Sequence, residues 1–161
     1  MIDLILKPLV SIGPFALGVS RPAARKAALD AGLAFKHERK DLDYFADNGI
    51  QVEYGDDGMA SFIGVSSGGA DYRLLYESTE LFDTPADVVF DFMSARDGSG
   101  PHAFDRNECL FPNQIIALWE ADEQYDYIRR KSGQRPLRQI WGQVAIGSPG
   151  YKEAVARILA R

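Results

Sequence analysis

Closely spaced carboxylates are the residues of this chain whose types and spacing could do chemistry. They form three pairs: Asp41 with Asp43, Asp56 with Asp57, and Asp122 with Glu123. Two carboxylates two positions apart on a strand share a face, where they could bind magnesium or divide acid and base roles. Residues 37–126, however, hold twenty acids, so pairs of this kind also arise by chance. The sequence does not favour catalysis by any of them.

Other reactive side chains lack the neighbours that catalysis or metal binding requires. His37 and His102 have no histidine four positions away and lie outside any His-Glu-x-x-His pattern, which gives a zinc site little support. Cys109 is the only cysteine, and Leu110 and Phe111 follow it in an expected strand, which indicates a small buried hydrophobe. No nucleophile elbow or phosphate-binding glycine loop occurs. We therefore predict no catalytic residue, no metal and no cofactor.

Three helices are predicted by capping signals and apolar spacing. Ser20 and Thr84 are placed to cap the first two helices, with Pro22 in the first turn of one and Pro85 at the first position of the other. Tyr151 begins an i, i+3, i+4 apolar series in the third. The expected ranges are 21–31, 85–96 and 149–160.

A β-hairpin is the clearest local prediction. Residues 50–54 and 59–65 carry β-forming side chains, and Gly55-Asp56-Asp57-Gly58 joins them with the Asp-Gly pair that favours a turn. Alternation along the first strand places Glu53 on the face opposite Val52 and Tyr54. Aspartate in the loop is explained by turn preference alone.

Further strands are expected at residues 114–120 and 137–146, while residues 33–48 fit either a short strand or a turn of helix. The pattern predicts a single α+β domain, residues 1–161, with an antiparallel β-sheet and helices packed on one face. The segments that begin "LGVSRPAARK" and "LFDTPADVV" share the order leucine, cap, proline, helix and glycine. A doubled helix-plus-hairpin unit is therefore an alternative to coincidence.

The apolar positions of these elements predict the core. Ile63 is its least secure member, because strict alternation places it opposite Phe62 unless both faces of the sheet are covered. The expected core consists of Phe62, Ile63, Val88, Val89, Phe92, Ile116, Leu118, Trp141, Val144, Val155 and Ile158.

Charge is distributed unevenly along the chain, whose net charge is -5. Residues 1–36 carry +3, residues 37–126 carry -15 and residues 127–161 carry +7. An acidic region of this size attracts basic partners and repels nucleic acid. The alternative is a set of ordinary solvated faces, neutralised in space by the C-terminal arginines. The N-terminal residues resemble neither a signal peptide nor a membrane span, so we expect a cytoplasmic protein that engages no membrane.

Aromatic residues accompany the acids in two segments, 41–57 and 120–126. Aromatic anchors within a charged rim are typical of protein-binding surfaces. Trp119 itself is expected in the core, because it lies on a strand. The predicted partner-binding residues are Asp41, Asp43, Tyr44, Asp47, Glu53, Asp56, Asp57, Glu120, Asp122, Glu123, Tyr125 and Asp126.

Three segments in order, "IGPFALGVS", "GIQVEYGDDGMASFIGVS" and "LFDTPADVVFDFM", resemble small single-domain bacterial immunity proteins of polymorphic toxin systems. The resemblance covers about the first 95 residues, with "IALWEAD" and "WGQVAIG" beyond them. It implies a non-enzymatic protein that occludes a cognate toxin, often a basic nuclease. Such families share no catalytic residues, so the resemblance assigns no residue a role.

The expected function is therefore that of a protein-binding inhibitor, an immunity protein that neutralises a basic toxin through an acidic surface. Two alternatives stay open: a housekeeping or structural α+β domain, and a small hydrolase or nucleotide-handling enzyme.

Overall fold

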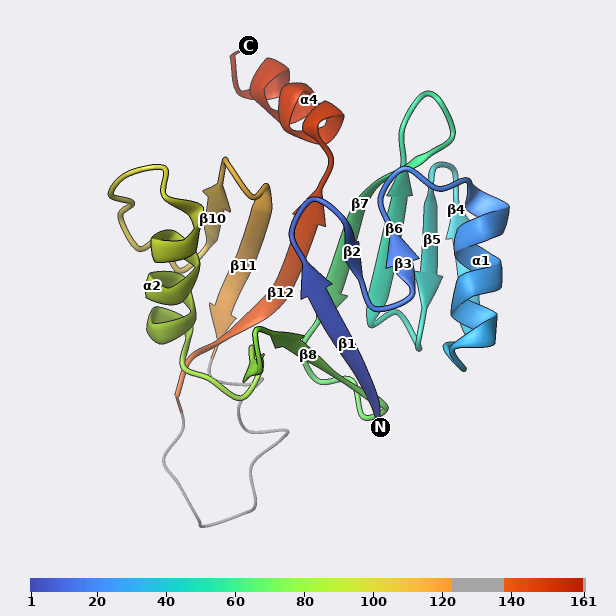
Figure 1. Ribbon diagram of the computed structural model, residues 1–161, viewed down its shortest axis with the longest axis horizontal. Coiled ribbons are helices and arrows are strands. Elements are labelled where there is room, and N and C mark those ends of the chain that lie inside the picture. Colours follow the sequence, from blue (N-terminus) through green and yellow to red (C-terminus); the bar gives the residue numbers. More distant parts are fainter. Residues whose placement is uncertain (123–137, 161) are drawn as a thin grey trace.

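The computed structural model describes residues 1–122 and 138–160, apart from the side chains of Asp122, Val155, Ile158 and Leu159 (Figure 1). Within these residues the chain forms a seven-stranded sheet, a five-stranded sheet and three helices. The α+β class is confirmed. None of the described helices is long and apolar enough to cross a bilayer.

The large sheet has the strand order β10-β11-β12-β7-β6-β5-β4, and every neighbouring pair is antiparallel. Its strands are β4 (Phe35–Arg39), β5 (Leu42–Phe45), β6 (Ile50–Tyr54), β7 (Ala60–Ser66), β10 (Glu108–Phe111), β11 (Ile116–Asp122) and β12 (Ile140–Gly147).

The small sheet has the order β3-β2-β1-β8-β9. Its strands are β1 (Ile2–Lys7), β2 (Ser11–Ile12), β3 (Phe15–Ala16), β8 (Tyr72–Tyr76) and β9 (Thr79–Glu80). Strands β1 and β8 pair in parallel, so the second sheet departs from the single antiparallel sheet that the sequence predicts. Parallel pairing requires a long connection, and here residues 8–71 provide it.

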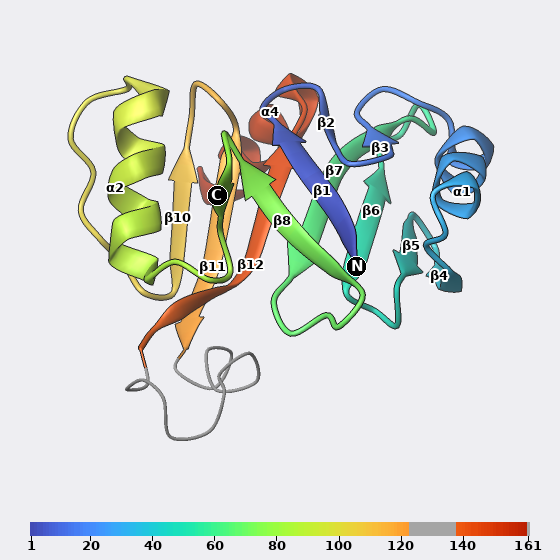
Figure 2. The same cartoon turned by 60° about the horizontal axis from the view of Figure 1, so that its bottom comes forward.

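The small sheet and two helices, α1 (Arg21–Asp30) and α2 (Ala86–Asp97), cover one face of the large sheet, which we call the inner face (Figures 1 and 2). The main core lies between these layers. Helix α4 (Pro149–Leu159) packs instead on the opposite, outer face, where the ring of Tyr151 lies 4.8 Å from that of Phe62. The helices are therefore divided between the two faces rather than gathered on one.

Side-chain capping explains where α1 begins but not where α2 begins. The Ser20 hydroxyl accepts a hydrogen bond from the Ala23 amide at 3.3 Å, as predicted for an N-cap. Thr84 does not cap α2. Its hydroxyl donates to the Glu80 carbonyl at 2.8 Å, and Pro85 becomes the N-cap without a side-chain bond.

The predicted hairpin is confirmed as β6 and β7, and Gly58 supplies the positive φ of its turn, +77°. The undecided residues 33–48 form the β4–β5 hairpin. Strands predicted at 114–120 and 137–146 are observed at 116–122 and 140–147.

The doubled unit that the sequence suggested has a counterpart in the order of elements. In each half, a strand of the small sheet precedes a helix, and the helix precedes an antiparallel meander of the large sheet. The last strands of the two meanders, β7 and β12, meet at the centre of the sheet. The halves are not equivalent, since a two-fold axis that relates antiparallel β7 and β12 would make β1 and β8 antiparallel as well.

The predicted core is largely confirmed. Ile63 and Phe62 are both buried because both faces of β7 are covered. The prediction for Val88 is wrong, because this side chain faces solvent and is 51% exposed. Phe92 is partly buried at the edge of the core. The side chains of Val155 and Ile158 lie outside the described residues. Buried as predicted are Phe62, Ile63, Val89, Ile116, Leu118, Trp141 and Val144.

Candidate functional site

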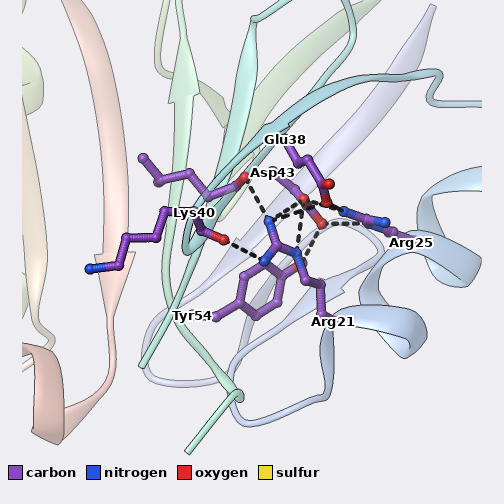
Figure 3. Close-up of polar contacts among 7 residues, drawn as sticks. Arg21, Arg25, Glu38, Lys40, Asp43 and Tyr54 are labelled. Carbon is purple, nitrogen blue, oxygen red and sulfur yellow. Dashed lines mark hydrogen bonds and ion pairs between the residues drawn. The ribbon is translucent and has the colours of Figure 1, made fainter. Parts of the chain in front are cut away.

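Asp43 is fully buried, although the sequence predicted it on a partner-binding surface. Figure 3 shows its polar contacts. Strand β5 points it to the inner face, toward two arginines of α1. Arg21 and Arg25 contact its carboxylate at 2.8 and 2.7 Å, and the Tyr54 hydroxyl donates to it at 3.1 Å. Arg25 also binds Glu38 at 2.6 Å. Asp43 therefore attaches α1 to the sheet and is not available to a partner.

The electrostatics of Asp43 follow from this cluster. Burial alone would raise its pKa, but hydrogen bonds from Arg25, Arg21 and Tyr54 favour the charged form and hold the pKa below its ordinary value. The pKa of Tyr54 is raised, first by burial and then by the adjacent Asp43 carboxylate. The network keeps Asp43 ionised, so its negative charge is compensated inside the molecule.

The remaining predicted acids do not form one surface. Strand register places Leu42, Glu53 and Phe62 at the same level of the sheet, so the turns holding Asp41, Asp56 and Asp57 lie at one end of the strands. Asp47 and Glu120 lie at the other end.

Several of these acids already have local roles. Asp47 pairs with Lys36 at 2.9 Å, and Asp57 accepts the Met59 amide at 2.9 Å within its turn. Asp122 ends β11, but its side chain lies outside the described residues, as do Glu123, Tyr125 and Asp126.

The structure does bring two predicted residues, Tyr44 and Glu53, to the outer face of the large sheet. Tyr44, Gln51, Gly64, Ala145 and Ala117 form one row of Cα partners across five strands. A second row joins Glu108, Trp119 and Gln143. Among the described elements, only α4 packs on this face. We define the outer-face site by its half-buried and aromatic side chains, Tyr44, Gln51, Glu53, Phe62, Trp119, Gln143 and Tyr151, together with the exposed Glu108.

An aromatic group lies at the centre of the outer-face site. The Phe62 ring lies 5.6 Å from Trp119 and 4.8 Å from Tyr151. Glu53 is the Cα partner of Phe62, and Glu108 is the Cα partner of Trp119. Each glutamate side chain therefore leaves the sheet next to an aromatic side chain on the same face. Burial, and then Glu53 and Glu108, raise the pKa of Tyr151 to about 12. The arrangement therefore combines rings with two carboxylates.

Glu53 differs from the acids described above. Burial raises its pKa above the ordinary value, and no cation of the described chain lies within ion-pair distance of it. A half-buried carboxylate without a partner is unfavourable in the free protein. A positively charged group bound beside it would remove that cost.

Sequence reasoning missed most of the outer-face site. Trp119 was expected in the core, but it is only half-buried, because Leu118 takes the inner position on β11. Alternation along β11 could have indicated this. No local signal joins Glu108 or Gln143 to Glu53, since that proximity depends on the order of strands in the sheet.

A separate hollow of about 380 Å³ lies between residues 46–49 and 66–72. Gly49 and Gly69 pass close to Tyr72, and a Cβ on either would lie 2.3 Å from its side-chain atoms. The Ser67 hydroxyl in this hollow is buried without a hydrogen-bond partner. A serine nucleophile needs a base within hydrogen-bond reach, and no described residue is hydrogen-bonded to the Ser67 hydroxyl.

Among the described residues, no three histidine, cysteine, aspartate or glutamate side chains are grouped closely enough to hold a metal ion. Comparisons with known proteins found no matching family model, no matching curated protein and no matching solved structure.

Proposed function

We propose that the protein is a non-enzymatic binding protein that inhibits a basic partner protein, as an immunity protein inhibits its toxin. The observation that carries the proposal is the outer-face site, where Phe62, Trp119 and Tyr151 lie beside the carboxylates Glu53 and Glu108. The half-buried rings of Trp119 and Tyr151 supply apolar contact area. The two carboxylates, which form no ion pair with another described residue, select a partner of opposite charge.

The location of the site reduces the number of predicted residues that can contact a partner directly. Of the twelve predicted residues, Tyr44 and Glu53 lie on this face, and Asp43 is removed because it is buried in the α1 network. Asp41, Asp56 and Asp57 border the same face at one end of the strands, where they would contribute long-range attraction rather than direct contact.

Charge-reversal variants test the proposal. Tagged protein is used to co-purify a stoichiometric basic protein from the native host, and each variant is then compared with the wild type. Changing both Glu53→Lys and Glu108→Lys should abolish co-purification and the partner's inhibition, because two attractive contacts become repulsive.

The matched control is Asp87→Lys with Asp91→Lys, which makes the same charge change on exposed positions of α2, a helix that packs on the inner face. Co-purification should persist in this control. If both double variants lose the partner equally, overall charge rather than the outer-face site decides binding, and the proposed surface is wrong.

A further inference from the structure

Arginine, carboxylate and an aromatic ring occur together three times in the described chain. Arg21 binds Asp43 at 2.8 Å with its guanidinium 5.0 Å from the Tyr54 ring. Arg25 binds the same carboxylate and lies 4.6 Å from Phe35. A third group joins Arg96, Glu77 and Phe92, with a guanidinium-to-ring distance of 3.4 Å.

The outer-face site has the same components except for the arginine. Glu53 supplies the carboxylate and the half-buried Tyr151 supplies the ring, which lies against the fully buried Phe62, the Cα partner of Glu53. No arginine or lysine of the described residues pairs with Glu53, and burial already disfavours its charged form. The cation that completes the other three groups is thus missing from this one within the described chain.

We infer that Glu53 and Tyr151 bind an arginine side chain that the basic partner protein inserts into the outer face, while Phe62, itself fully buried, supports the Tyr151 ring. This rests on the proposed function and deepens it by naming the group that is recognised. The guanidinium donates to the Glu53 carboxylate while its plane lies against a ring.

Arginine fits this position better than lysine for two reasons. A guanidinium is planar and can stack on a ring while donating to a carboxylate, whereas an ammonium is a compact point charge. A guanidinium is also less strongly hydrated, so it loses less on entering a half-buried position. The three internal examples all use arginine.

The direct test is a titration of ¹⁵N-labelled protein with N-acetyl-arginine N-methylamide, followed by amide chemical shifts. Saturable shifts are expected at Glu53, Phe62, Gly64 and Tyr151. The citrulline analogue, which has the same shape without charge, should bind at least about tenfold more weakly, as should the lysine analogue. Equal shifts with citrulline, or no saturable shift with arginine, would overturn the inference.

Two variants locate the interaction. Glu53→Gln should weaken binding of the arginine probe about tenfold or more, because the charge is lost while the shape is kept. Asp91→Asn, which removes an exposed charge from α2 on the other side of the sheet, should leave it unchanged. Unchanged binding in Glu53→Gln would assign the shifts to another acid and would contradict the inference.

The inference and the proposed function fail in different experiments. A basic partner that co-purifies equally with wild type and Glu53→Gln, beside an arginine probe that does not bind, overturns only the arginine site. A probe that binds at Glu53, beside a basic partner whose binding is unaffected by the Glu53→Lys, Glu108→Lys change, overturns the proposed function and the partner as the source of the arginine, while arginine binding at Glu53 itself stands.

Discussion

At the scale of single residues, the carboxylates of the acidic region differ in whether a described cation compensates their charge. Asp43 is enclosed by Arg21, Arg25 and Tyr54, whereas Glu53 on the next strand faces the other way without a cation from the described chain. Composition alone treats these acids as equivalent. Their opposite environments give opposite predictions for stability.

Replacing Asp43 with asparagine should lower the free energy of unfolding by about 3 kcal/mol near neutral pH, because it removes the charge that two arginines share. Asp30→Asn, which breaks the exposed Lys26–Asp30 pair, should change it by less than about 0.5 kcal/mol. Denaturant midpoints at constant slope measure both variants. Equal losses in the two would contradict a structural role for the buried network.

The pH dependence of the Asp43 effect has a definite sign. Its folded-state pKa lies below the unfolded value of about 3.9, so its contribution is complete above that value and is lost as pH falls through the folded pKa. The difference between wild type and Asp43→Asn should therefore stay constant above about pH 5 and shrink in more acidic solution. A constant difference down to the acid transition would show that Asp43 is not held ionised by its partners.

Glu53→Gln should have the opposite effect and stabilise the free protein slightly, by less than about 1 kcal/mol at pH 7. The pKa of Glu53 is raised in the folded state, so the folded protein binds a proton on the Glu53 carboxylate more tightly than the unfolded chain does. The free energy of unfolding of the wild type therefore falls as pH rises through the range in which Glu53 ionises. The variant has no carboxyl group at this position, so it does not lose this stability. The gain should disappear below about pH 4, as followed by thermal unfolding across pH. A destabilised variant at pH 7 would show that the Glu53 charge is compensated.

At the scale of elements, helix α2 shows that capping and periodicity predict the position of a helix better than its orientation. They locate the helix to within a residue, but Val88 and Val89 are adjacent and only one can face the sheet. The sequence places both in the core, and the structure exposes Val88. The ridge that docks consists of Ala86, Val89, Phe90, Met93 and Asp97.

The two valines provide a matched comparison. Val89→Ala should cost about 2 kcal/mol, because it removes two buried methyl groups and leaves a cavity. Val88→Ala should be neutral within about 0.5 kcal/mol, because the side chain is half-exposed and alanine favours the helix. Equal costs, measured by denaturant unfolding, would mean that α2 is rotated from the described orientation.

Individual helices, strands and hairpins could be predicted from the sequence, whereas the pairing of strands distant in the sequence could not. Glu53 opposite Val52 follows from alternation, and the β6–β7 register follows from the turn at Gly58. The pairing of β1 with β8 joins residues about 70 positions apart without a turn to connect them, so no local pattern indicates it. The outer-face site depends on the same long-range strand order, which is why only Tyr44 and Glu53 of it were expected.

At the scale of the whole molecule, one continuous core joins both sheets with α1 and α2. The Trp141 indole donates to the Ala86 carbonyl at 2.9 Å, which connects the large sheet to α2, and the Tyr72 hydroxyl donates to the Ser66 carbonyl at 2.6 Å, which connects the two sheets. Such continuity predicts a single cooperative unit.

Cooperative unfolding checks this prediction with two probes. Tryptophan fluorescence, which reports on the large sheet, and far-ultraviolet circular dichroism should give coincident denaturant transitions. Val89→Ala should move both midpoints together. Separate transitions would divide the chain into independently folding units and would contradict the single core.

The uneven distribution of charge is also a property of the whole molecule. Described carboxylates at Asp3, Asp47, Glu77 and Asp83 are paired with lysine or arginine, so part of the acidic excess is neutralised locally. The outer-face site retains two carboxylates beside three aromatic rings. Binding of a basic partner through this face is the central claim.

The most direct measurement of that claim is the association rate of the co-purified partner as a function of ionic strength. For wild type it should fall steeply with salt, because screening shortens to about 8 Å at physiological ionic strength. The Glu53→Lys, Glu108→Lys variant should associate more slowly and lose most of the salt dependence, whereas the Asp87→Lys, Asp91→Lys control should keep it. An association rate that neither salt nor the outer-face reversal changes would contradict the account and leave these carboxylates as ordinary solvated surface.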